Sequence, residues 1–243
     1  MPAPSSSEPA SLADSAPALV AISHGTDSVP GRQLVGALVA AIRDRMPDTH
    51  GGFVDVLQPD VETVLRKLPP GRPAVVVPLL LSAGYHVRVD IGRAARKADR
   101  PVAVAGALGP DDGLARLLAA RLAAAGLTDD DEVVLAAAGS SDQAAVVDCR
   151  EQGRRLAALL DRPVAVGFLS AAQPTLRDAV ETARATGRRV VVATYLLAPG
   201  YFERQVRAAG PDVMTAPLLD GGAVPPELVG AALARYAAAR LPD

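Results

Sequence analysis

The sequence predicts an α/β protein built from two homologous subdomains, each with a parallel sheet of about four strands flanked by helices, with a cleft between them. Two observations predict this fold: apolar strands alternate with helical segments, and three blocks of the first part of the chain recur in the second. Strands that alternate with helices favour right-handed crossovers and a parallel sheet covered on both faces. A chain of 243 residues has room for two such compact units.

The first part of the chain alternates between strand and helix from residue 18 onwards. The apolar run 18–22 is typical of a buried parallel strand, and apolar residues at helical spacing over 34–42 predict a helix. Further strands are expected over 52–57, 74–81 and 102–106. Further helices are expected over 61–68, 88–98 and 114–125. This order predicts four parallel strands in the first unit.

The second part of the chain repeats the first. Residues 24–26 match 138–140 at an offset of 114, residues 52–59 match 167–174 at 115, and residues 80–86 match 196–202 at 116. A drift of single residues is expected if small insertions fall in loops. We therefore predict an internal duplication, with a flexible tail over 1–17, one half over 18–127 and a homologous half over 132–243, joined by an acidic linker.

Composition narrows the class of protein. Hydrophobic residues make up 49% and charged residues 21%, as in an ordinary soluble globular protein. A formal charge of -2 and 3% aromatic residues argue against a nucleic-acid partner. A lone cysteine, Cys149, excludes an internal disulfide and fits a reducing cytoplasm. The tail lacks the pattern of a signal peptide, and no apolar stretch is long enough to span a membrane.

Comparison of the two halves distinguishes residues that maintain the fold from residues that could bind a ligand or react. The glycines, the Gln-Pro pair and a tyrosine (Tyr85 and Tyr201) occur in both halves, and we interpret the glycines and the Gln-Pro pair as scaffold. Three potential ligands of the first half are replaced in the second: His24 by Ala138, Asp55 by Ser170 and His86 by Phe202. Each is expected at or just beyond the carboxyl end of a strand, where open parallel sheets bind ligands. This pattern indicates one active half and one supporting half.

The residue types point to a transition metal. Imidazole is largely neutral at pH 7, so it can donate a lone pair to a metal or accept a proton. Two histidines, with or without a carboxylate, suit Fe, Co, Ni or Zn better than Mg or Ca and leave coordination positions open. Taken singly, a histidine such as His24 or His86 is more often a hydrogen-bonded loop residue than a ligand, and Asp55 can equally cap the following turn or helix.

Other reactive residues carry weaker hypotheses. His50 lies in a polar stretch that predicts a turn, with a solvent-exposed role rather than ligation. Cys149 is expected to be a packed small hydrophobe, because the second half has no histidine to activate it. Ser140 and Ser141 would suit a hydrolase, but no partnered base accompanies them.

The Ser-His-Gly-Thr loop at 23–26, the Phe-Val-Asp-Val-Leu-Gln-Pro strand at 53–59 and the block at 79–91 resemble the sirohydrochlorin chelatases of the CbiX/SirB type. The resemblance runs from about Leu19 to Arg240, in the long two-copy form of these class II chelatases. It implies a lyase that inserts Fe²⁺ or Co²⁺ into sirohydrochlorin without ATP, with His24 and His86 as the paired metal-binding and catalytic histidines. The family often has glutamate where Asp55 stands, which leaves direct ligation by the shorter carboxylate open.

Metal insertion must remove two pyrrole N–H protons. We expect His24 and His86 to hold the ion between the halves and one of them to accept a proton, while Asp55 orients an imidazole or completes the metal shell. Arginine forks near the cleft would bind the substrate's carboxylates, or else they form ordinary solvated helix faces. The candidates are Arg88, Arg93, Arg204 and Arg207.

Several alternatives stay open at the level of sequence. A non-catalytic two-lobed protein that binds a metal or a tetrapyrrole would use the same architecture. Iron and cobalt are not distinguished, Ni²⁺ or Zn²⁺ would also bind such ligands, and no cofactor beyond the substrate metal is expected. Two halves around one cleft in one chain would allow a monomer.

Overall fold

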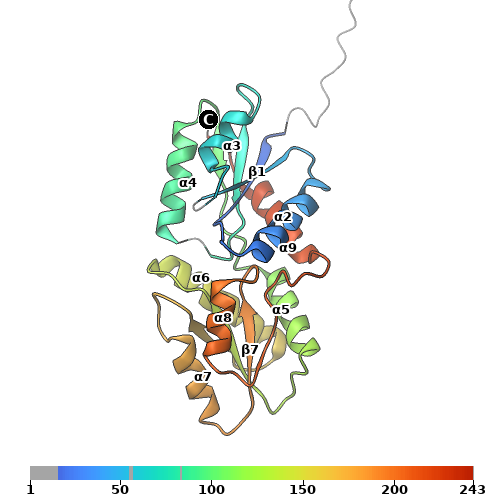
Figure 1. The fold of residues 1–243 in the computed structure, drawn as a ribbon, viewed down its shortest axis with the longest axis vertical. Coiled ribbons are helices and arrows are strands. Elements are labelled where there is room, and N and C mark those ends of the chain that lie inside the picture. Colours follow the sequence, from blue (N-terminus) through green and yellow to red (C-terminus); the bar gives the residue numbers. More distant parts are fainter. Residues whose placement is uncertain (1–15, 55–56, 83, 243) are drawn as a thin grey trace, which may run out of the picture.

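The computed structural model describes residues 16–54, 57–82 and 84–242, except for the side chains of residues 85–88. Two four-stranded parallel sheets lie in two lobes, which are stacked along the long axis of the molecule (Figure 1). The predicted α/β fold with two sheets is therefore confirmed. None of the helices in the described ranges is long and apolar enough to cross a membrane.

The first lobe contains the sheet β2-β1-β3-β4. Its strands are β1 (Ala18–Ser23), β2 (Thr49–Phe53), β3 (Ala74–Pro78) and β4 (Val102–Val104). Helices α2 (Val29–Arg43) and α9 (Pro226–Ala238) cover one face, and α3 (Val61–Lys67) and α4 (Tyr85–Lys97) cover the other. Because successive strand residues point to opposite faces, Leu19 and Ala21 pack in one core and Val20 and Ile22 in the other.

The second lobe repeats this arrangement with the sheet β6-β5-β7-β8. Its strands are β5 (Glu132–Ala137), β6 (Ala165–Phe168), β7 (Val190–Tyr195) and β8 (Val213–Met214). Helices α5 (Asp112–Ala124) and α6 (Gln143–Leu160) cover one face, and α7 (Leu176–Arg184) and α8 (Tyr201–Ala208) cover the other. Equivalent hydrogen bonds recur, from Phe53 N to Pro59 O at 2.9 Å and from Phe168 N to Pro174 O at 3.0 Å. The two lobes therefore share one topology.

The last helix of each half packs on the opposite lobe. Helix α5 follows β4 in the chain but packs against α6 and β7, whereas α9 ends the chain and packs against α2 and β3. Figure 1 shows α9 beside α2 in one lobe and α5 in the other. The sequence spacing did not predict this exchange. As a result, two connecting segments cross between the lobes, one after β4 and one after β8.

Some boundaries differ from the predictions. A strand was expected over 52–57, but β2 spans Thr49–Phe53, because its register with β1 begins at Leu19–Thr49 and ends at Ser23–Phe53. The turn predicted around His50 is therefore wrong: His50 lies in β2, with a ring nitrogen 2.8 Å from Asp48 Oδ1 and a side chain 40% exposed. Strand β3 ends at Pro78 rather than 81, and α4 begins at Tyr85 rather than 88.

The glycines shared by the two halves allow close packing of helices on the sheets. A Cβ on Gly52 would lie 2.7 Å from Val64 Cγ2 in α3. A Cβ on the equivalent Gly167 would lie 2.7 Å from Leu176 Cα in α7. Side-chain carbons do not approach other heavy atoms so closely, so each helix packs on its strand because a glycine faces it. This geometry supports the interpretation of these glycines as scaffold.

Asp131 is a buried carboxylate just before β5, at the junction of the two halves. It is 2% exposed and accepts two hydrogen bonds from Arg189, each at 2.7 Å, and one from Thr128 N at 2.7 Å. The hydrogen bonds from Arg189 hold the pKa of Asp131 well below its ordinary value. The ionised carboxylate therefore stabilises the start of the second half.

We expect Asp131→Asn to lower the free energy of unfolding by about 2 kcal/mol at neutral pH, because it removes a charge-assisted pair. Because the pKa of Asp131 is lowered on folding, its contribution is full above the unfolded value of about 4 and is lost as the pH falls through the folded value. Urea unfolding between neutral pH and about pH 2 should show the gap between wild type and variant shrinking below about pH 4. The exposed neighbour Asp129 provides the control Asp129→Asn, and a gap that does not change with pH would contradict this account.

Candidate functional site

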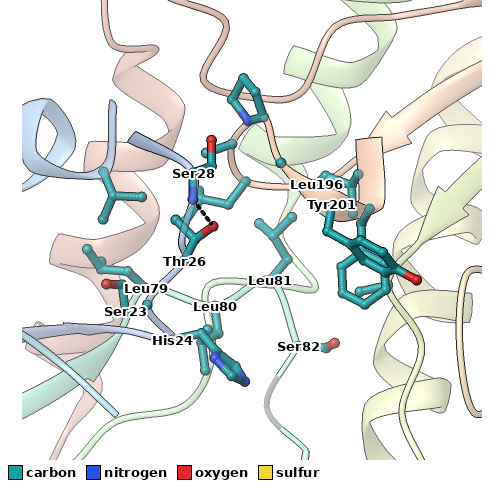
Figure 2. Close-up of a pocket in the computed structure, with 18 of the residues that line it drawn as sticks. Ser23, His24, Thr26, Ser28, Leu79, Leu80, Leu81, Ser82, Leu196 and Tyr201 are labelled. Atoms are coloured by element: carbon teal, nitrogen blue, oxygen red, sulfur yellow. Dashed lines mark hydrogen bonds between the residues drawn. The ribbon is translucent and has the colours of Figure 1, made fainter. Parts of the chain in front are cut away.

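A cleft of about 990 Å³ lies between the lobes. Its walls come from the segments after β1 and β3 in the first lobe and after β5 and β7 in the second. These segments follow the carboxyl ends of parallel strands, where open α/β sheets bind ligands. The volume lies at the upper end of the range for small-molecule sites. Figure 2 shows His24 on the first-lobe side of this cleft and Tyr201 on the second-lobe side.

His24 stands where the sequence predicts it, directly after the last residue of β1, and its exposed side chain lines the cleft. Gly25 follows with a φ of +93°, a conformation that favours glycine, and Gly139 adopts +87° at the equivalent turn. Arg32 Nη1 donates to Thr26 O at 2.9 Å, which ties the loop to α2. The backbone that carries the imidazole is therefore fixed by β1 before it and by the hydrogen bond from Arg32 after it.

The remaining predicted ligands are less completely described. Asp55 lies outside the described residues, so the strand predicted around it is not tested there. His86 belongs to the first turn of α4 rather than to a strand end, and its side chain, like that of Arg88, lies outside the described residues. Gly84, which precedes α4, lines the cleft, so α4 starts at the cleft wall. Within the described part of the chain, no three His, Cys, Asp or Glu residues are grouped to hold a metal.

The predicted substrate arginines separate into two groups. Arg204 lines the cleft, and its guanidinium lies 5.8 Å from the ring centroid of Tyr201. Arg93 and Arg207 are not among the residues that line the cleft: Arg93 is 3.9 Å from Asp90, and Arg207 is 3.9 Å from Glu203 with 72% of its side chain exposed. Arg204 therefore borders the cleft, whereas Arg93 and Arg207 lie on exposed helix surfaces, and contact of any of them with a substrate stays a prediction.

The cleft also contains residues that the sequence did not single out, among them Arg32 and Tyr201. Arg32 in α2 lines the first-lobe wall, and its place just after the His24 loop is a signal that could have suggested it. Tyr201 lines the opposite wall with 63% exposure, and its ring meets that of Phe202 edge to face at 5.6 Å. Because the first half has Tyr85 at the equivalent position, Tyr201 is not among the residues that differ between the halves, and the comparison did not single it out.

The nucleophile-type residues of the second lobe also border the cleft. Ser140 and Ser141 line it, but all three histidines of the chain belong to the first half, so neither serine has an imidazole base from its own half. Cys149 is 2% exposed, and burial raises the pKa of its thiol. The expectation that Cys149 is a packed small residue is therefore confirmed.

Fold and cleft together define a two-lobed α/β protein with a ligand-sized cleft between duplicated lobes. The family model CbiX matches residues 18–125 and 132–210, and the chain belongs to the CbiX family. The family resemblance seen in the sequence is thereby confirmed. No curated protein matches the chain at a significant level.

Solved structures share the two-lobed fold. SirB from Bacillus subtilis with Fe³⁺ has a TM-score of 0.75 and 22% identity, covering 92% of this chain and 96% of that one. The sirohydrochlorin chelatase SirB from Bacillus subtilis subspecies spizizenii in complex with cobalt has a TM-score of 0.71 and 19% identity, covering 91% and 94%. CbiX, described as the terminal enzyme of siroheme biosynthesis in denitrifying bacteria, has a TM-score of 0.63 and 20% identity, covering 89% and 98%.

Proposed function

We propose that this chain is a sirohydrochlorin chelatase that inserts Fe²⁺ or Co²⁺ into the macrocycle without ATP. The observation that carries this proposal is the position of His24, exposed in the interlobe cleft of a CbiX-family chain, where the duplicated lobe has Ala138. The similar structures of SirB with Fe³⁺ and with cobalt support these two metals as substrates. Because one chain forms both walls of the cleft, we further propose that the monomer is sufficient.

In the proposed mechanism, His24 and His86 donate imidazole lone pairs to the incoming ion and leave positions free for the ring nitrogens. As the ion passes to the macrocycle, two pyrrole N–H protons leave: one passes to an imidazole whose lone pair the ion has released, and the other passes to solvent in the cleft. Asp55 would orient an imidazole or complete the metal shell. The metal is a substrate here, so weak and incomplete ligation favours its release.

The substrate's carboxylates would be bound from both walls. Arg204 comes from the second lobe and Arg32 from the first, so a carboxylated ring between them would meet a guanidinium on each side. Arg32 keeps one donor on Thr26 O, which limits the number of hydrogen bonds it can offer. Arg204 is therefore the stronger candidate for substrate contact.

Turnover tests the proposed function. Purified chain is mixed anaerobically with an excess of sirohydrochlorin and either Fe²⁺ or Co²⁺, and the absorption change of the macrocycle is followed. We expect many turnovers per chain, and the ratio of kcat/KM for the two ions identifies the preferred metal. An absorption change that stops at about one equivalent per chain would instead establish the alternative, a non-catalytic binding protein.

Arg204→Gln should raise KM for sirohydrochlorin about tenfold with little change in kcat, because it removes a charge-assisted contact made in both ground and transition states. Arg207→Gln is the matched control, since Arg207 is in the same helix but points to solvent beside Glu203. Steady-state kinetics with varied sirohydrochlorin checks the pair. Equal KM values for the two variants would remove Arg204 from substrate binding.

A further inference from the structure

Contacts from the second lobe fall on neighbouring residues of the segment that joins β3 to α4. Tyr195 Oη donates a hydrogen bond to Leu81 O at 3.1 Å, and Cys149 Sγ donates to Ser82 Oγ at 3.5 Å. Two residues further on, Gly84 lies so close to Ser140 that a Cβ would be 2.9 Å from the serine hydroxyl. The segment that leads into α4, and so to His86, is therefore held from across the cleft.

In both polar contacts the donor belongs to the second lobe and the acceptor to the first, and comparison of the two halves shows that the reverse contacts cannot form. Tyr195 corresponds to Leu79 at the offset of 116, and Cys149 corresponds to Val35 at the offset of 114. Leu79 and Val35 have no hydrogen-bonding side chain, so the first lobe has no matching donors to offer in return. By contrast, the packing of Gly84 on Ser140 has its counterpart in Gly200, whose Cβ would be 3.7 Å from Thr26 Oγ1.

The backbone carbonyls of the two equivalent segments have different donors. In the second lobe, Leu197 O accepts from Leu219 N at 2.8 Å, within the same lobe. Its counterpart Leu81 O accepts the Tyr195 hydroxyl of the other lobe. The carbonyl at this position therefore has a donor from its own lobe in the second lobe, but a donor from the opposite lobe in the first.

Burial makes the Tyr195 contact a strong positional constraint. Tyr195 is 2% exposed, so its hydroxyl has little access to water and needs a protein acceptor. A Cβ at residue 109 would overlap this hydroxyl, so the space it occupies exists because that residue is Gly109. The hydroxyl is therefore confined beside Leu81 O.

We propose that Tyr195, assisted by Cys149, is a positioning residue for the metal site: the second lobe fixes Leu81 and Ser82 and thereby the first turn of α4, where His86 lies. This inference rests on the proposed function in so far as His86 is a metal ligand. It assigns the second lobe an active part in building the site. Outer contacts of this kind commonly change metal affinity or activity by about 10- to 100-fold when they are removed.

Tyr195→Phe tests the proposal, with Thr194→Val as its matched control. Thr194 is the adjacent residue of β7, is fully buried, and donates its hydroxyl to Thr215 O at 2.7 Å within the second lobe. Both variants lose one buried hydroxyl, but only Tyr195→Phe loses the contact across the cleft. Amide hydrogen exchange of the region 79–90 is measured in the full chain, together with Co²⁺ affinity and steady-state kinetics.

We expect Tyr195→Phe to speed amide exchange at the start of α4, to weaken Co²⁺ binding about tenfold and to lower kcat about tenfold with KM for sirohydrochlorin nearly unchanged. Thr194→Val should leave all of these near wild type after correction for global stability. If Tyr195→Phe does not fold, Cys149→Ala is the second variant, with a smaller loss of about threefold because a thiol is a weak donor.

Equal exchange rates at the start of α4 in the two hydroxyl variants would overturn the positioning role. A wild-type chain without turnover would contradict the proposed function, but the exchange comparison would still decide whether Tyr195 holds this segment. Faster exchange with unchanged Co²⁺ affinity would likewise overturn the link to the metal site.

Discussion

His24→Ala is expected to reduce the rate of metal insertion on the order of 10³-fold, because it removes a metal donor and a candidate proton acceptor at once. His24 is exposed in the cleft at the carboxyl end of β1, so its truncation leaves the core of the first lobe intact. The loss should appear in kcat and in Co²⁺ affinity together. Steady-state kinetics and equilibrium binding measure both.

His50→Ala is the matched control for this loss. His50 also belongs to the first lobe, but it lies in β2, half-exposed beside Asp48, and is not among the residues that line the cleft. Its removal should leave turnover within about twofold of wild type. Wild-type turnover in His24→Ala would remove His24 from the mechanism, and equal losses in both variants would indicate a general effect on folding.

Arg235→Ala is expected to lower the free energy of unfolding by about 3 kcal/mol, because several charge-assisted hydrogen bonds to backbone carbonyls are lost together. Arg235 in α9 donates to Ala107 O at 2.6 Å, Leu108 O at 3.0 Å and Pro110 O at 2.9 Å. These carbonyls belong to the segment that crosses from the first lobe to the second after β4. The guanidinium of Arg235 therefore binds α9 to the segment that connects β4 with α5.

Urea unfolding at neutral pH measures this effect. Arg240→Ala serves as the control, because Arg240 is exposed, follows α9 in the chain and contacts carbonyls at the end of that helix. Its loss should cost less than about 0.5 kcal/mol. Similar losses for the two variants would show that the crossing segment does not depend on Arg235.

Much of the fold was accessible from the sequence because its signals are local. Buried parallel strands appear as apolar runs, and the duplication appears as matching blocks at a nearly constant offset. The exchange of α5 and α9 was not accessible, because an apolar helix face requires a sheet to cover but does not specify which one. The start of β2 was missed for a related reason: its register with β1 begins at Thr49, in a polar stretch that local propensity does not mark as a strand.

The candidate site also has features that the sequence predicts and features that it does not. The position of His24 followed from the rule that parallel sheets bind ligands at their carboxyl edge. Arg204 and Arg207, however, lie in the same helix, and which of them reaches the cleft depends on how the two lobes are placed. The role of Tyr195 could not be predicted, because its strand is uniformly buried and reads as core. Its hydroxyl donates to a carbonyl 114 residues away in the chain, a contact that the sequence does not show.

The central claim is that a duplicated chain keeps one metal site, built around His24 in the first lobe. An equilibrium titration with Co²⁺, followed by the absorption of the bound ion, tests this claim most directly. We predict about one Co²⁺ per chain for the wild type and loss of that ion in His24→Ala, with His50→Ala unchanged. Two equivalent ions per wild-type chain, or an unchanged isotherm in His24→Ala, would contradict it.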